Sequence, residues 1–95
     1  MLVGMYRIRS LDKTKTKDVE ESLKGAQAKF RNLPGCRGLR VLADVNNPEV
    51  FISVSYWNDA DTNIQTEIIN SAIDTALENF STEKQSETYR IVQEL

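Results

Sequence analysis

Two strand-like segments joined by a very short link dominate the middle of the sequence. Residues 50–57, VFISVSYW, are rich in β-branched and aromatic side chains, and residues 36–45, CRGLRVLADV, form the strand-like segment before them. The link between them, NNPE, has the composition of a turn. A connection this short joins neighbouring strands only in the antiparallel direction. The two segments are therefore predicted to form a β-hairpin, around which the rest of the chain must fold.

A helical pattern lies on each side of this hairpin. Before it, the chain is predicted to form a helix that starts at a capping box made by Asp18 and Glu21 and stops at the LPG step, with an apolar stripe of Val19, Leu23, Ala26, Phe30 and Leu33. After it, Asn58 is the predicted N-cap of a helix that runs towards Ser81, with Asp59 and Asp61 in its first turn. Its apolar stripe contains Ile69, Ile73, Ala76 and Phe80, and a phase slip predicts a break near residues 66–69.

Strands at the two ends complete the pattern. Residues 2–9, LVGMYRIR, alternate between two faces, and ETYRIVQEL at residues 87–95 does the same. The order strand, helix, strand, strand, helix, strand predicts an α+β fold of the ferredoxin-like type, in which two helices cover one face of a four-stranded antiparallel sheet. With 95 residues and no linker or repeat, one domain over residues 1–95 is expected.

The sheet face away from the helices is expected to be partly apolar. Alternation predicts that the helix-covered face holds Leu2, Tyr6, Ile8, Val50, Ile52, Val54, Tyr89 and Ile91. The opposite face then carries apolar side chains among polar ones: Val3, Met5, Phe51, Trp57 and Val92. Burial of this apolar area against a second subunit is favourable, so a homodimer is predicted.

Composition argues against several classes of protein. The chain has no histidine, which removes histidine-based nucleophile systems, histidine-rich zinc sites and a histidine haem ligand, and no metal site is predicted. A net charge of -2 does not suggest nucleic-acid binding. No apolar run approaches the ~18 residues of a membrane span. A single cysteine, Cys36, and the lack of a signal-peptide pattern favour a cytoplasmic location.

The stretch LPGCRGLRVLADVNNPEVFISVSYWND resembles the middle of the antibiotic biosynthesis monooxygenase (ABM) domain family. The resemblance rests on Pro34, Gly35, Gly38, the hairpin and Trp57, and covers nearly the whole chain in element order and length. It implies a dimeric α+β barrel with a cavity in each protomer. Some members oxidise polycyclic aromatic substrates with dioxygen and without metal or flavin, others degrade haem, and many have no known activity.

For this chain the resemblance implies a cofactor-independent monooxygenase whose catalytic residues stay unassigned. Trp57 stands at the family's position at the end of the third strand. Family enzymes commonly place an asparagine in the first strand, where this chain offers Met5 and Arg7, and haem-degrading members use a helix histidine that is missing here. The alternative is a non-catalytic dimeric module that binds a small aromatic acid or acts as an interaction partner.

Read without the family, the second sheet face is a candidate ligand site. Alternation gathers polar and basic side chains there around an apolar wall: Arg7, Arg40, Arg90, Ser53 and Ser55 beside Met5, Phe51 and Trp57. Guanidinium groups beside aromatic rings suit a planar anionic ligand, so an aromatic or conjugated acid is one hypothesis. The other interpretation is that the arginines pair with acidic residues at a dimer rim and that Trp57 packs between helix and sheet.

Overall fold

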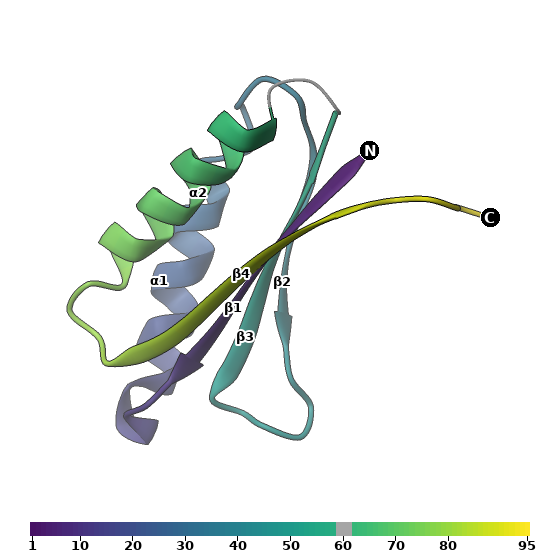
Figure 1. The fold of residues 1–95 in the computed structure, drawn as a ribbon. Helices are drawn as coiled ribbons and strands as arrows, with labels where there is room; N and C mark the ends of the chain where they lie inside the picture. Colours follow the sequence, from purple (N-terminus) through teal and green to yellow (C-terminus); the bar gives the residue numbers. More distant parts are fainter. Residues whose placement is uncertain (59–61) are drawn as a thin grey trace.

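The chain folds into a four-stranded antiparallel sheet with two helices on one face (Figure 1). The computed structural model describes residues 1–58 and 62–95. The elements follow in the order β1 (Leu2–Ser10), the 3-10 turn η1 (Lys13–Lys15), α1 (Thr16–Ala28), β2 (Cys36–Ala43), β3 (Val50–Trp57), α2 (Thr62–Ala76) and β4 (Thr82–Arg90). The strands lie in the order β2-β3-β1-β4. This confirms the predicted ferredoxin-like α+β fold.

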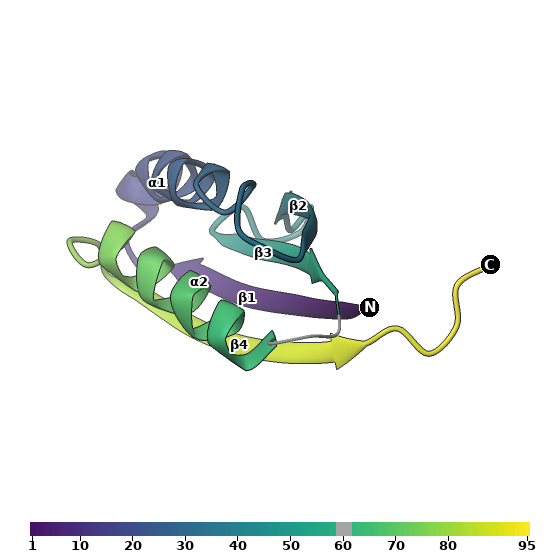
Figure 2. The same cartoon turned by 90° about the horizontal axis from the view of Figure 1, so that it is seen from above.

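Each helix covers its own half of the sheet. Figure 2 shows α1 above β3 and β2, and α2 above β1 and β4. The two central strands, β3 and β1, therefore lie beneath the seam between the helices, where a buried site can form.

Among the described residues, no helix has the length and apolar composition needed to cross a membrane.

The helices differ from the sequence prediction at their ends. Lys15 is the N-cap of α1 and makes no side-chain hydrogen bond there, so the predicted capping box is wrong and Asp18 lies in the first turn. The helix stops at Ala28, and turns lead to Gly35, whose φ of 85° suits glycine. α2 runs without interruption from Thr62 to Ala76, so the predicted break is wrong. Asp59 and Asp61, predicted in its first turn, lie outside the described residues.

The last strand lies earlier in the chain than predicted. β4 pairs with β1 from Thr82, opposite Ser10, to Arg90, opposite Leu2. Residues 91–95 form an irregular tail that leaves the sheet (Figure 1), tied at its start by a hydrogen bond from the Ile91 N–H to the Met1 carbonyl at 3.0 Å. The sequence of β4, TEKQSETYR, is too polar to show a strand period, so backbone pairing fixes its position.

The orientation of β3 is the reverse of the prediction: the face that was expected to be open packs against the helices. Phe51 lies opposite Ile8 on β1, and Ser53 lies opposite Tyr6, so all four share the helix-covered face. Phe51 and Trp57 are 3% and 1% exposed and belong to the core. The prediction that placed them on the open face is therefore wrong. The open face instead receives Val50, Ile52, Val54 and Tyr56 from β3.

The core fills the space between the helices and the sheet. α1 contributes Val19, Leu23 and Ala26, and α2 with the turn after it contributes Ile69, Ile73 and Leu77. These side chains pack against Tyr6, Ile8, Phe30, Phe51 and Trp57. Trp57 therefore lies between helices and sheet, at the end of β3, where it contacts this apolar cluster.

Candidate functional site

Polar side chains are buried inside this otherwise apolar layer. Ser53 and Ser55 of β3 are 2% and 4% exposed, and Gln27 of α1 reaches down to them. The Gln27 side-chain nitrogen Nε2 lies 3.1 Å from the Ser53 hydroxyl and within hydrogen-bond distance of the main-chain oxygens of Arg40 (2.5 Å) and Val54 (3.3 Å). Buried polar groups are normally paired in this way. One helix amide thus ties α1 to β2 and β3 and holds a serine hydroxyl in the interior.

Trp57 places a second polar group in the same interior. Its indole N–H, at Nε1, is fully buried and has no hydrogen-bond partner among the described residues. A buried donor without a partner costs about 1–3 kcal/mol. The side chain is held there by packing against the core, so the N–H is available to an acceptor that the described residues do not supply.

Gly4 has no side chain, which leaves space beside the indole N–H of Trp57. A Cβ atom at Gly4 would lie 2.8 Å from the Ser55 hydroxyl oxygen and 4.0 Å from Trp57 Nε1. The first distance is too short for a real contact, so only glycine fits without a shift of Ser55. The Ser55 hydroxyl donates a long hydrogen bond, 3.4 Å, to the Gly4 carbonyl. Gly4 therefore keeps a hydroxyl and an indole N–H close to one another.

A small pocket opens at this point between α2 and the sheet. Its volume is about 10 Å³, which is room for roughly one water molecule. Its walls come from β1, β3, β4 and α2: Gly4, Met5, Tyr6, Ser53, Ser55, Ile69, Asn70, Ser86 and Glu87. The lining residues of the pocket thus carry hydroxyl groups, one amide and one carboxylate, that of Glu87, around a space of atomic size.

A hydrogen bond links Tyr6, which lines the pocket, to the carboxylate of Asp74. The Tyr6 hydroxyl donates a hydrogen bond to Asp74 of α2, and Lys84 Nζ of β4 lies 3.2 Å from the same carboxylate oxygen. Burial, then the hydrogen bond to Asp74 and its negative charge, raise the pKa of the Tyr6 hydroxyl well above its ordinary value. Tyr6 therefore stays protonated, and Asp74 is a proton acceptor linked to the pocket by one hydroxyl group.

Comparison with known families identifies the chain. The family model described as antibiotic biosynthesis monooxygenase matches residues 1–65. The chain belongs to the ABM family. The matched part includes β1, α1 and the β2–β3 hairpin, which together carry Gly4, Gln27, Ser53, Ser55 and Trp57.

Solved structures share the fold of this ABM protein at low sequence identity. A proposed antibiotic biosynthesis monooxygenase from Deinococcus radiodurans has 18% identity and a TM-score of 0.81, over 100% of this chain and 96% of that one. SnoaB, a cofactor-independent oxygenase from Streptomyces nogalater, has 15% identity and a TM-score of 0.78, over 99% and 95%. A conserved protein from Methanosarcina mazei Go1 has 17% identity and a TM-score of 0.69, over 95% and 92%. A search of curated proteins finds no match.

In this ABM protein, the residues that were predicted to form one site lie on two different faces of the sheet. Phe51, Ser53, Ser55 and Trp57 lie together on the helix-covered face. Met5, Arg7 and Arg40 lie on the open face, where Arg40 stands over the Tyr56 ring at 6.0 Å. Arg90 lies at the end of the edge strand β4, opposite Leu2, which in turn lies opposite Trp57, so the register places Arg90 on the helix-covered face. Arg7 and Arg40 are therefore not on the face of Trp57, and the prediction that placed all of these residues on one face is wrong.

Three residues of the interior site were missed by sequence reasoning. Gln27 occupies the buried stripe of α1, four positions after Leu23, and a polar residue on an apolar stripe was a usable signal. Gly4 and Asp74 gave no such signal, because their roles depend on Ser55 and Tyr6, which are distant in the chain. Where side chains are described, no three acidic or cysteine residues come close enough to bind a metal ion.

Proposed function

We propose that this ABM protein is a cofactor-independent monooxygenase that oxidises an aromatic substrate between its helices and sheet. Membership of the family supports the reaction class, and the structural likeness to SnoaB, a cofactor-independent oxygenase, supports the absence of a cofactor. The observation that carries the proposal is the buried, unpaired N–H of Trp57 beside Ser55 and Gly4. It is a donor suited to an oxygen atom of a bound substrate.

The proposed reaction needs a substrate that forms a stabilised carbanion. An anthrone methylene group is an example, because loss of one proton gives an enolate that can donate electrons to dioxygen. One oxygen atom then becomes the new carbonyl, and the other leaves as water with the two hydrogens of the methylene group. The Trp57 N–H and the Ser55 hydroxyl would hydrogen-bond the enolate oxygen, which lowers the energy of the charge that develops there.

Asp74 is the residue proposed to accept the proton. Its carboxylate receives the hydrogen bond of Tyr6, whose side chain lines the pocket. Proton transfer from substrate to the Tyr6 oxygen, with transfer of the tyrosine proton to Asp74, neutralises the Asp74 carboxylate and leaves the negative charge on the substrate enolate. Before the transfer, the carboxylate lies 3.2 Å from Lys84 Nζ. Sequence reasoning offered no base, and the tertiary contact of Tyr6 with Asp74 supplies one.

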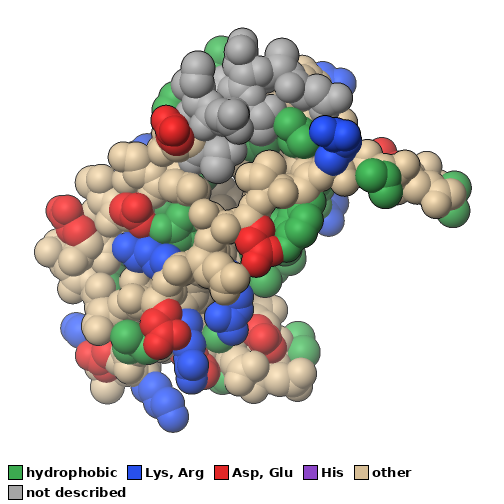
Figure 3. Space-filling model, in the orientation of Figure 1, with side chains coloured by type: hydrophobic (Ala, Val, Ile, Leu, Met, Phe, Trp, Pro, Cys, Tyr) green, Lys and Arg blue, Asp and Glu red, His purple; other side chains and the backbone are tan. Residues whose placement is uncertain are grey.

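The small size of the pocket favours a second candidate function. A volume of about 10 Å³ is far below the ~300–1,000 Å³ of sites for organic ligands, so a ring system enters only if α2 separates from the sheet. If that does not occur, the chain is a non-catalytic dimeric module. The open sheet face supports the homodimer in either case, because hydrophobic side chains that are at least partly exposed gather on this concave side below the tail (Figure 3): Val3, Met5, Leu42, Ile52, Tyr56 and Tyr89.

Oxygen uptake distinguishes the two functions. The pure protein is incubated with a dihydroxyanthrone or a dihydroxynaphthalene in an oxygen electrode, with the spontaneous rate subtracted. The monooxygenase proposal expects one dioxygen consumed per anthrone oxidised. It expects Trp57→Phe to lose at least about tenfold in rate with an unchanged circular dichroism spectrum, since removal of one such donor usually costs ~10²–10³. Tyr89→Phe on the open face is the matched control and should keep its rate. Absence of protein-dependent uptake with both substrates favours the non-catalytic module.

A further inference from the structure

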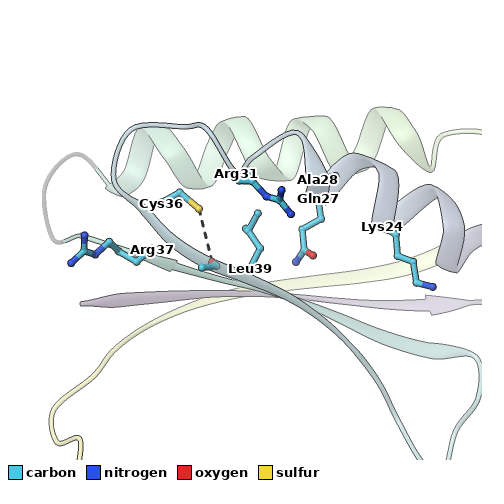
Figure 4. Close-up of a pocket in the computed structure, with 8 residues that line it drawn as sticks. Lys24, Gln27, Ala28, Arg31, Cys36, Arg37 and Leu39 are labelled. Atoms are coloured by element: carbon cyan, nitrogen blue, oxygen red, sulfur yellow. Dashed lines mark hydrogen bonds between the residues drawn. The ribbon is translucent and has the colours of Figure 1, made fainter.

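A larger hollow lies between α1 and the free edge of β2 (Figure 4). Its volume of about 440 Å³ falls within the ~300–1,000 Å³ typical of small organic ligand sites. Gln27, Cys36 and Leu39 line it from α1 and β2, and basic side chains stand around it. The hollow is separate from the interior pocket, which lies under α2. We call it the α1–β2 groove.

The charge of the α1–β2 groove is positive. Among the described residues, its lining contains Lys24, Arg31 and Arg37 and no acidic side chain. The ammonium group of Lys24 lies 3.5 Å and 3.4 Å from the carboxylates of Glu20 and Glu21, which largely balance its charge. Arg31 and Arg37 form no ion pair with any residue of the described chain. Two guanidinium groups without an ion-pair partner among the described residues therefore belong to the lining of one hollow, in a protein whose net charge is -2.

A β-bulge accounts for the position of Arg37. Cys36 pairs with Trp57 and Gly38 with the adjacent Tyr56, so Arg37 is the extra residue on β2 without a partner on β3. Bulges at sheet edges commonly redirect a side chain, and they recur beside functional sites. Figure 4 shows Arg31 extended along the groove towards Gln27, with Arg37 beyond Cys36 at the outer rim. The two guanidinium groups thus stand on either side of Cys36.

We infer that the α1–β2 groove binds a small organic anion, with its carboxylate or phosphate group held by Arg31. Guanidinium groups pair with both kinds of oxyanion through two parallel hydrogen bonds. Leu39 and Ala28 offer an apolar surface to the rest of the ligand. Gln27 lines this groove and also holds Ser53 in the interior, so an occupied groove contacts a residue that helps to shape the interior site.

A nitrogen-15 NMR titration tests the groove without any reference to catalysis. The probes are benzoate, inorganic phosphate and benzylammonium, which has the ring of benzoate with the opposite charge. Saturable shifts at the amides of Arg31, Gly38 and Leu39 with benzoate or phosphate are expected, and the tighter of the two identifies the preferred oxyanion. Arg31→Gln should weaken this binding roughly tenfold, because a hydrogen bond to a charged group is lost.

Arg90→Gln is the matched control, since it removes the same charge from the other edge strand, β4. It should change the affinity less than about twofold, as expected for a distant surface charge that salt screens. The inference is overturned if neither anion saturates, if benzylammonium binds as tightly as benzoate, or if the two glutamine variants bind alike. Unchanged spectra of the free variants away from each substitution establish that both are folded.

Discussion

The Tyr6 hydroxyl of β1 donates its hydrogen bond to Asp74 of α2, 68 positions further along the chain. Lys84 of β4 approaches the same carboxylate oxygen to 3.2 Å. One carboxylate thus connects the helix layer with the central strand β1 and the edge strand β4. Tyr6 also lines the pocket beside Gly4, so the same side chain joins the pocket to this link between helix and sheet.

Stability should depend on the protonation of Tyr6. Burial, together with Asp74, raises the pKa of its hydroxyl in the folded state, whereas in the unfolded chain it ionises near its ordinary value of about 10. The stabilisation is therefore complete below about pH 10 and is lost as the pH rises from there towards the folded-state pKa. Urea unfolding at pH 8 and pH 10.5 should show a stability advantage of the wild type over Tyr6→Phe that shrinks at the higher pH. An advantage that grows with pH would contradict the assignment.

The hydrogen bond and the ion pair at Asp74 should contribute unequally. Asp74→Ala leaves the buried Tyr6 hydroxyl without its acceptor, so the free energy of unfolding should fall by about 1–3 kcal/mol. Lys84→Ala removes only a solvent-exposed ion pair and should cost less than about 1 kcal/mol. Chemical denaturation of both variants at pH 7 measures the two values. Equal losses would mean that the ion pair, and not the tyrosine contact, holds α2 to the sheet.

Substitution by alanine should lower the stability of the protein at Gly4 and raise it at Gly25. At Gly4 the new methyl group would meet the Ser55 hydroxyl at 2.8 Å, and such overpacking costs about 1–3 kcal/mol. At Gly25 of α1, a new Cβ atom would meet no atom within 4 Å apart from its chain neighbours and the backbone of its own helix. Alanine there should therefore stabilise the helix by about 1 kcal/mol. Thermal unfolding reports both effects. Ser55→Ala should relieve most of the cost of Gly4→Ala, and an additive double mutant would show that the two sites do not touch.

The open face of the sheet should carry the predicted homodimer. Ile52 lies between Arg7 of β1 and Leu42 of β2, so Ile52→Glu places a charge in the middle of the apolar surface. Light scattering should give about twice the 10.8 kDa chain mass for the wild type and the single-chain mass for this variant. Val45→Glu, at a side chain 96% exposed in the hairpin turn, is the control and should remain dimeric. A wild-type protein that is monomeric at micromolar concentration would refute the dimer.

The order of elements could be predicted from the sequence, but the orientation of β3 could not. The short NNPE turn fixed the hairpin, and the stripe of Val19, Leu23 and Ala26 fixed the face of α1. In β3, however, both faces are apolar enough to be buried, and six of its eight residues are buried. A one-residue change of register exchanges the two faces. Only the packing of Trp57 against both helices and the pairing of Gln27 with Ser53 decide between them.

The same limit applies to the candidate site. Trp57 and Ser55 were recognised from the sequence, but the sequence could not show that the indole N–H lacks a partner. Arg37 of the α1–β2 groove was overlooked because a bulge there breaks the alternation on which face assignments depend. Arg31 was overlooked because it lies in the turns between α1 and β2, where no period assigns a face. Tertiary contacts, which alternation cannot encode, therefore determine which polar groups share a pocket.

The exposed strand β4 bears on how the family can diverge. Eight of its nine residues are exposed, so main-chain pairing with β1 holds it in place with little help from side-chain packing. Almost any polar sequence of strand-forming length could occupy this edge, and selection for the fold leaves few marks on it. The family model matches residues 1–65 and so does not include β4, whereas the likeness to the Deinococcus radiodurans structure extends over the whole chain.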